Sequence, residues 1–326
     1  MAVVFSLLGL PQCDGRVITL GQRGSEAGAG GDLGSSGSAN GGKGGTTGGG
    51  GASSHVVEPL FTNITLIKEI AASDTSFKDE NPTLTADLLE LYFYSTRRKG
   101  TDSDDDVWVA KRAKVTDVWN APVLLTPVST ALSETSPAIS ADGLKIWVGV
   151  DMTGGLGKRD IWRYERTSRS ADFGATAILE PNVNSTEDDI PRPPGNQGKT
   201  MPLASRRDSS TYQTYFTSRA SATGDFATPS LITELTTAGE KFGDGFLSDD
   251  GLTFFFAMGG DGKGDIYVTT RTSVTSPFDI PVALSTINTT NDERDPWLSP
   301  DGGTLYFMSN RTDNVSRIFQ ATRVNK

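Results

Sequence analysis

The sequence is short of the residues that most often build disulfides, zinc sites and proton-transfer sites. Among 326 residues there is one cysteine, Cys13, and one histidine, His55. Both precede the region that we expect to fold. Its core therefore has no internal disulfide, no zinc site of cysteine and histidine ligands, and no histidine-dependent catalytic triad.

Long apolar runs and an excess of positive charge are also missing. No run approaches the roughly 18 apolar residues of a membrane-spanning helix. The 30 Lys and Arg residues face 40 Asp and Glu residues, a formal net charge of −10. This charge argues against nucleic acids and anionic membrane surfaces as partners. We expect a monomer that needs no cofactor and whose partner is a protein, a peptide or a glycan.

The first 13 residues end a short apolar run at Cys13, in the order LLGLPQC. This arrangement resembles the end of a bacterial lipoprotein signal peptide, in which a lipid-modified cysteine becomes the mature N-terminus. The resemblance implies a location in the bacterial cell envelope, as an outer-membrane lipoprotein, in the periplasm or at the cell surface. Contact with a membrane would then pass only through the lipid anchor. The alternative is an ordinary apolar N-terminus with an incidental cysteine.

Residues 14–55 are rich in glycine and serine. From Gly24 to Gly51 the chain has 14 glycines in 28 residues. A segment of this composition cannot bury enough apolar surface to offset the entropy of ordering it. We predict a disordered tether here, followed by one folded domain over residues 56–326.

The folded region repeats itself with a period of about 50 residues. Three features recur in register: a turn such as SPDG, an arginine that closes each unit, and an acid three residues before a proline or glycine. The closing arginines are Arg112, Arg166, Arg219, Arg271 and Arg323. The repeats lie near residues 79–130, 134–184, 188–236, 240–288 and 293–323. Features that keep one period through five copies predict a repeat architecture.

Each unit is typical of four short antiparallel strands. A first strand follows the acid, Asp-Gly supplies a tight turn, and two strands rich in aromatic and β-branched residues follow, such as TFFFA and DIYVTTR. A fourth run containing proline leads into the next unit. This pattern predicts a five-bladed, all-β propeller of four-stranded antiparallel blades. The acid-x-x-Pro, S-[PAD]-D-G and S-x-R motifs resemble the TolB-type propeller repeats, a resemblance that implies the fold but not a particular function.

The two ends of the repeat region predict how the ring closes. Only three residues follow Arg323, so the last unit lacks a fourth strand of its own. The segment 60–70, FTNITLIKEI with its preceding leucine, has the pattern of a strand and precedes the first unit. Pairing of this N-terminal strand with the last blade would complete the ring and leave no open edge.

The recurring acids and the S-x-R arginines fall on one face of the predicted propeller, at the mouth of its channel. The acids are Asp79, Glu134, Asp188, Glu240 and Glu293, and the arginines are Arg97, Arg207 and Arg311. One hypothesis is an acidic face that binds a cation or the polar groups of a ligand. The other, favoured by the repetition, is an internal ion pair that locks each blade to its neighbour.

The arginine is missing from units 2 and 4, so Glu134 and Glu240 are the best candidates for ligand contact. Trp297 lies on the innermost strand of unit 5 alone, where it is a candidate channel residue. The acidic run from Asp102 to Asp106 has calcium as an alternative to a solvated loop. The sequence therefore favours a non-enzymatic binding or scaffold propeller. The alternative is a glycan-acting hydrolase, sialidase-like or a five-bladed glycosidase, that uses carboxylates at the channel mouth.

Overall fold

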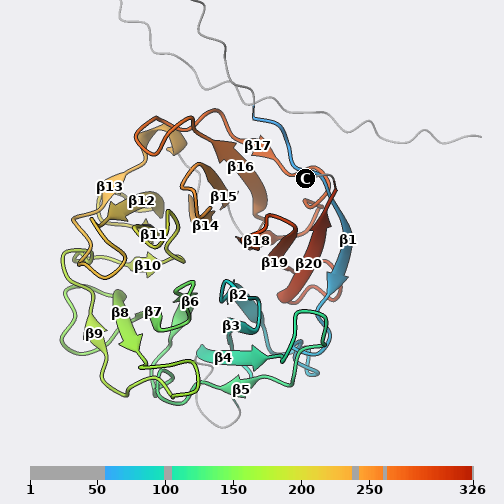
Figure 1. The fold of residues 1–326 in the computed structure, drawn as a ribbon, viewed down its shortest axis with the longest axis horizontal. Coiled ribbons are helices and arrows are strands. Elements are labelled where there is room, and N and C mark those ends of the chain that lie inside the picture. The colour runs from blue at the N-terminus through green and yellow to red at the C-terminus, as the bar shows by residue number, and fades with distance from the viewer. Residues whose placement is uncertain (1–55, 99–104, 237–241, 260–262, 325–326) are drawn as a thin grey trace, which may run out of the picture. The chain divides into compact units, whose positions relative to one another are not determined.

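The computed structural model describes residues 56–98, 105–236, 242–259 and 263–324. These residues form five sheets of four antiparallel strands, which follow one another around a central channel (Figure 1). The fold is the predicted five-bladed β-propeller. The predicted signal-like segment and the glycine-rich tether lie outside the described residues.

Within each blade the chain runs from the innermost strand at the channel to the outermost strand at the rim. Blade 1 contains β2 (Asp79–Leu84), β3 (Glu90–Ser95), β4 (Asp106–Lys111) and β5 (Val123–Leu124). Blade 2 contains β6 (Thr135–Ile139), β7 (Lys145–Val150), β8 (Asp160–Glu165) and β9 (Ile178–Leu179). Blade 3 contains β10 (Asp189–Pro191), β11 (Thr200–Ser205), β12 (Gln213–Ser218) and β13 (Ser230–Leu231), with the short 3-10 helix η1 (Thr233–Leu235) after it. Blade 4 contains β14 (Phe242–Leu247), β15 (Thr253–Met258), β16 (Asp265–Thr270) and β17 (Val282–Ala283).

Blade 5 closes the ring with strands from both ends of the folded region. Its order is β18 (Glu293–Leu298), β19 (Thr304–Ser309), β20 (Arg317–Arg323) and then β1 (Phe61–Leu66). β1 pairs antiparallel with β20, from Phe61 opposite Arg323 to Leu66 opposite Phe319. The predicted closure is confirmed, although the strand ends at Leu66, because the chain turns between Ile67 and Ile70 and buries both side chains.

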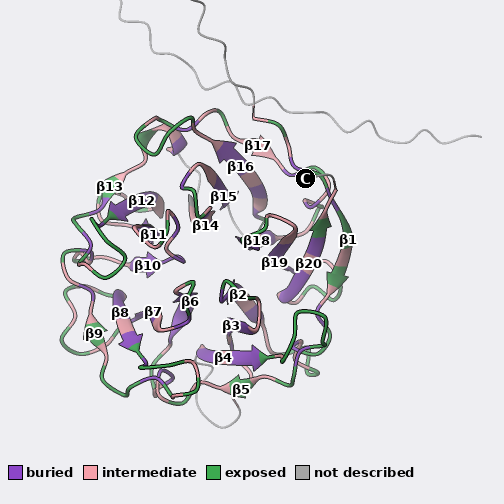
Figure 2. Cartoon of the chain, viewed as in Figure 1, coloured by how far each residue is buried: buried purple, intermediate pink, exposed green. Residues whose placement is uncertain are grey.

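The core lies between the blades, as the position of the aromatic residues on the strands predicts. Five clusters of buried side chains each join the facing surfaces of two neighbouring blades. Trp147, for example, is fully buried against Phe226 of the next blade, with ring centroids 6.3 Å apart. Figure 2 shows this burial along the strands, with exposure concentrated in the outer loops. Burial of one large apolar side chain contributes roughly 1.5–3 kcal/mol, so the interfaces hold the ring together.

The closing arginine of a unit holds the turn between the first two strands of its own blade. In blades 1 to 4 its Nε donates to a backbone carbonyl of that turn, for example from Arg271 to Gly251 at 2.8 Å. The guanidinium also lies over an aromatic ring, 4.5 Å from the centroid of Phe278 in the case of Arg271. This feature of the repeat is therefore part of the scaffold.

Candidate functional site

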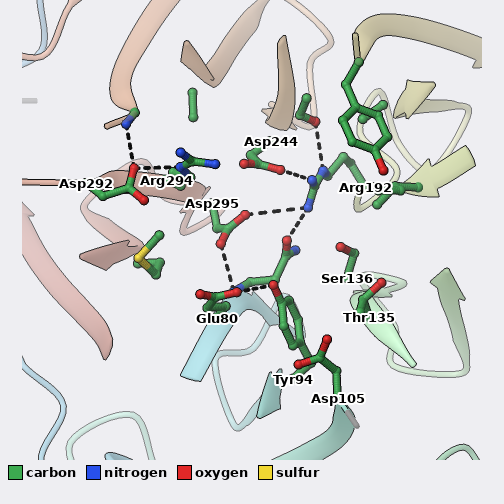
Figure 3. Close-up of a pocket in the computed structure, with 18 of the residues that line it drawn as sticks. Glu80, Tyr94, Asp105, Thr135, Ser136, Arg192, Asp244, Asp292, Arg294 and Asp295 are labelled. Atoms are coloured by element: carbon green, nitrogen blue, oxygen red, sulfur yellow. Dashed lines mark hydrogen bonds and ion pairs between the residues drawn. The ribbon is translucent and has the colours of Figure 1, made fainter. Parts of the chain in front are cut away.

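A cavity of about 380 Å³ opens at the mouth of the central channel, and all five blades contribute to its lining (Figure 3). Its walls are formed mainly by the first residues of the innermost strands and by the ends of the strands that pair with them. Volumes of this size suit small ligands or the end of a longer one.

A β-bulge aims the lining side chains into the channel. The pairing of the first two strands shifts register after Glu80, after Thr135, after Phe242 and after Arg294. In three of these bulges the second residue has a positive φ, which is 59° at Asn81, 52° at Ser136 and 54° at Asp295. Bulges re-aim side chains in this way. Asn and Asp tolerate the left-handed conformation better than most residues.

Blade 3 departs from this pattern and places an arginine in the centre of the channel. β10 pairs with β11 without a register shift, and the chain continues past Pro191 to Arg192. The Arg192 side chain is 4 % exposed and donates to Asp244, to the Gly243 carbonyl at 3.0 Å and to Asn81 Oδ1. Its Nη1 also lies 3.7 Å from Asp295 Oδ1. Arg192 therefore links blade 3 to blades 4, 5 and 1.

Asp295 is the most perturbed carboxyl group of the cavity. Burial raises its pKa well above the ordinary value, and the neighbouring Asp244 carboxylate raises it further, while Arg192 acts in the opposite direction. One Asp295 oxygen accepts a hydrogen bond from the Asn81 amide at 3.1 Å. A carboxyl group in this environment favours its protonated form.

A second polar group lies on blade 1. The Tyr94 hydroxyl donates to Glu80, and Lys78 Nζ lies 3.6 Å from Glu80 and 3.3 Å from Asp105. Burial and the Glu80 charge raise the pKa of Tyr94 well above its ordinary value. Although burial alone would lower the pKa of Lys78, the two carboxylates raise it. Both groups therefore keep their protons at neutral pH and act as donors.

The remaining cationic groups line the cavity from blades 2, 3 and 5. Arg206 Nη1 lies 3.2 Å from Asp188, and its guanidinium lies 4.2 Å from the ring centroid of Tyr212. Arg294 Nε donates to Asp292 at 2.7 Å. Arg159 makes no side-chain hydrogen bond or ion pair with any described residue.

The cavity lining has equal numbers of acidic and basic residues, whereas the sequence predicted an acidic face at the channel mouth. The cavity has five acidic residues and as many basic ones; the acids are Glu80, Asp105, Asp244, Asp292 and Asp295, and the bases are Lys78, Arg159, Arg192, Arg206 and Arg294. Of the recurring acids that the structure describes, none lines the cavity, and Asp79, Glu134 and Glu293 are fully buried.

The recurring acid forms the expected internal ion pair in blades 1 and 5. Asp79 and Glu293 are fully buried, and they pair with Arg97 and with Arg311, the latter at 3.2 Å. Each arginine also donates to the serine two residues before it and to a carbonyl of the segment that enters its blade, Ile70 or Ile287. Each pair joins two residues of one blade, so these contacts belong to the scaffold, and a lock between neighbouring blades stays a prediction.

In blade 3 the equivalent acid is Asp189, not the predicted Asp188. Asp189 is fully buried and lies 2.6 Å from Arg207, and it pairs with Ser205 as Asp79 pairs with Ser95. Because β10 lacks the bulge residue, counting three residues back from Pro191 reaches the position before the buried acid. Asp188 points to Arg206 and Tyr212 at the cavity rim.

Glu134 is fully buried and has no cation within ion-pair distance among the described residues. It accepts hydrogen bonds from the amide and the hydroxyl of Thr130. Burial raises its pKa to about 7. The missing arginine was predicted correctly, but Glu134 does not line the cavity, and its role in ligand contact stays a prediction.

The other predicted site residues fall elsewhere. Trp297 is 4 % exposed, packs between Phe246 and Tyr306, and lines a second cavity of about 370 Å³ at the opposite end of the channel. Glu240 and Cys13 lie outside the described residues, as does most of the acidic run that suggested calcium. In the ranges that the structure describes, no cluster of three acidic, histidine or cysteine side chains could hold a metal ion. The same ranges contain no helix long and apolar enough to span a membrane.

Sequence reasoning missed the cavity lining, much of which occupies the positions just after a recurring acid. The sequence shows these positions by their variation, because they differ from unit to unit beside an acid that repeats. They are Glu80-Asn81, Thr135-Ser136, Ile190 and Arg294-Asp295.

Comparison with known proteins supports the fold. No protein-family model matches the sequence, and no curated protein matches it. Solved structures that match include TolB from Acinetobacter baumannii, with 18 % identity over 76 % of this chain and a TM-score of 0.46. This chain spans 55 % of the length of that protein. A putative TolB from Agrobacterium tumefaciens matches at 16 % identity over 78 % of this chain and 79 % of that one, with a TM-score of 0.45. A thermostable family-43 glycoside hydrolase matches at 12 % identity over 80 % of this chain and 93 % of that one, with a TM-score of 0.50.

The chain is a five-bladed β-propeller, and its repeat motifs resemble those of the TolB type. Its structural neighbours include both TolB-like propellers and glycoside hydrolases. At these identities the likeness concerns the fold alone, and a function has to be argued from the site.

Proposed function

We propose that this protein is a non-enzymatic binding propeller that holds a small polar ligand, or the polar end of a glycan, peptide or protein, in the cavity at the channel mouth. The observation that carries the proposal is the composition of the lining. Residues that differ from blade to blade converge on one cavity, while the repeated residues around them are committed to the scaffold. A single asymmetric ligand needs such an asymmetric lining.

The lining is also held in place before any ligand arrives. All five carboxylates of the cavity have a hydrogen bond or an ion pair to the protein, such as Asp292 to the Gly264 amide and Asp105 to Lys78. Side chains fixed in this way lose little entropy on binding, which favours selective recognition.

Two substitutions at opposite ends of β15 provide a matched test. Met258 lines the channel-mouth cavity and Thr253 lines the cavity at the other end. The melting temperature is measured with panels of oligosaccharides and short peptides, because a ligand that binds only the folded state raises it in proportion to ln(1 + [L]/Kd). We expect at least one ligand to raise it in the wild type and in Thr253→Trp but not in Met258→Trp.

Two results would contradict the proposed binding site. Loss of the shift in Thr253→Trp with retention in Met258→Trp would move the site to the opposite cavity. No shift with any member of the panels would contradict a small-ligand site. Circular dichroism of both variants controls for folding.

A glycan-acting hydrolase is the second candidate, and the environment of Asp295 favours it. A general acid needs a carboxyl group that keeps its proton near neutral pH beside a second carboxylate that does not. Burial and Asp244 give Asp295 the raised pKa that this role requires. Against it, Asp295 is 8 % exposed and bonded to Arg192 and Asn81, so a substrate would have to reach a largely enclosed group.

Turnover separates the two candidates. The hydrolase predicts release of reducing ends from a glycan that binds, and a loss of at least 100-fold in Asp295→Asn. The binding protein predicts saturable binding with no product in either form.

The cell-envelope location is a separate proposal that rests on Cys13 and the apolar run before it. Lipidation of Cys13 predicts incorporation of a labelled fatty acid in a bacterial host and loss of the label in Cys13→Ser. Equal labelling of both forms, or of neither, would contradict it.

A further inference from the structure

The channel-mouth cavity has more unmet hydrogen-bond donors than acceptors. Each lining carboxylate has a hydrogen bond or an ion pair, although Asp105 Oδ1 has only the ion pair with Lys78, at 3.3 Å. The guanidinium groups of three arginines, by contrast, keep N–H groups unused. Arg159 makes no side-chain bond with a described residue, Arg206 is bound through Nη1, and Arg294 is bound through Nε. An arginine has five N–H donors, so most of this capacity is unmet.

Two of these donors are buried as well as unpaired. Nε of Arg159 and Nε of Arg206 are shielded from solvent and have no hydrogen-bond partner among the described residues. A buried donor without an acceptor costs about 1–3 kcal/mol, so these two guanidinium groups have hydrogen-bonding capacity that the described residues do not meet.

Arg159 and Arg206 act on the same corner of the cavity. The Arg159 carbonyl accepts a hydrogen bond from the Asp189 amide at 2.7 Å, and the Arg206 amide donates to the Asp188 carbonyl at 3.1 Å, so both arginines adjoin the start of β10. Arg206 stacks on the Tyr212 ring, which keeps its planar fork in one orientation. Stacked, oriented guanidinium groups suit the two oxygens of a carboxylate.

The rest of the lining suits a ring of hydroxyl groups. Its apolar side chains are few, with Ile190, Met258 and Met308 the largest, so it offers no deep slot for the apolar side chains of a peptide. Hydroxyl groups both donate and accept, and they can use the spare lone pairs of paired carboxylates such as Glu80 and Asp105.

On these grounds we infer that the ligand is an acidic sugar unit, a uronate, whose carboxylate is bound by Arg159 and Arg206 while its hydroxyl groups face the carboxylates of blades 1 and 5. This inference rests on the proposed function, because it assigns the ligand of the same cavity.

A matched pair of disaccharides tests the inference with the full chain. Cellobiouronate and cellobiose differ only in that a carboxylate replaces a hydroxymethyl group. By titration calorimetry we expect cellobiouronate to bind at least ~10-fold more tightly than cellobiose, because cellobiose lacks the carboxylate that accepts charge-assisted hydrogen bonds. Arg159→Gln should remove that preference. Arg323→Gln should keep it, because Arg323 lines the opposite cavity and also has an unpaired buried Nε.

Three outcomes would overturn the inference. They are equal affinity for the two sugars, an equal loss in Arg323→Gln, and binding of a peptide with a free C-terminal carboxylate, but not its amide, in the absence of uronate binding. If neither sugar binds but another ligand loses affinity in Met258→Trp, only the uronate inference fails. If no ligand depends on Met258, the proposed function fails with it.

Discussion

Arg192, which directly follows β10, donates a hydrogen bond to Asn81 of β2, 111 residues away, and so joins two blades that are not neighbours in the ring. The same guanidinium reaches Asp244 and Asp295 of blades 4 and 5. A propeller is otherwise held together between adjacent blades, so this contact across the channel sets the position of the residues that line the cavity.

Replacement of Arg192 by methionine should destabilise the protein. The substitution removes the donor that Asn81, Asp244 and the Gly243 carbonyl share, and a buried acceptor left without its donor costs about 1–3 kcal/mol. Urea unfolding should therefore show a fall of this size. Lys158→Met, which removes an exposed cation paired with the exposed Glu187, should cost less. Equal costs would show that Arg192 has no special role.

The two neighbouring acids of blade 3 should differ sharply. Asp189→Asn removes the partner of Arg207 at a fully buried position and should lower the free energy of unfolding by about 3 kcal/mol. Asp188→Asn weakens a contact to an arginine side chain that is 37 % exposed and should change it by less than about 1 kcal/mol. The reverse order in denaturant unfolding would restore the register that the sequence predicted.

Glu134 should make stability depend on pH in a distinctive direction. Its pKa rises through burial from an ordinary value of 4.5 to about 7, so the folded state holds the proton more tightly than the unfolded chain does. The free energy of unfolding should fall as pH rises from about 4.5 to about 7, by roughly 2 kcal/mol, and then level off.

Glu134→Gln should remove this part of the pH dependence, which urea unfolding at a series of pH values measures. Thr130→Val deletes a hydroxyl that donates to the ionised carboxylate, so it should extend the fall to higher pH. A slope unchanged in Glu134→Gln would assign the pH dependence to another group.

The closing arginines should not tolerate lysine where they clamp a turn. Arg271→Lys loses the fixed bond from Nε to the Gly251 carbonyl and the flat contact with Phe278. A loss of about 1–2 kcal/mol is expected in unfolding experiments. Arg323→Lys is the matched control, since its Nε has no partner in the described part of the chain. If both variants lose the same stability, the turn contact contributes nothing.

The sequence predicts the repeated parts of this protein well and the site poorly, for a physical reason. The inter-blade aromatic residues and the pairing of Arg97 with Asp79 recur in several blades, so a repeat reveals them. Closure by β1 follows from the fourth strand that the last unit lacks. The bulges at Asn81 and Asp295, and the absence of one at β10, depend on local backbone conformation. A one-residue difference there moved the predicted acid from Asp189 to Asp188.

Repetition made the recurring acids stand out as candidate ligand contacts, although repetition indicates a structural role. A carboxylate that recurs in each unit serves the scaffold, as Asp79 and Glu293 do. The cavity instead uses residues without a repeat, such as Arg159 and Arg192, whose convergence follows only from the closed ring.

The most direct test of the central claim is a crystal structure of the complex with the ligand that raises the melting temperature most. We expect ligand density in the channel-mouth cavity, with an oxygen of the ligand within hydrogen-bond distance of Arg159 or Arg206. Density in the opposite cavity beside Trp297, or on the outer surface of a blade, would contradict it.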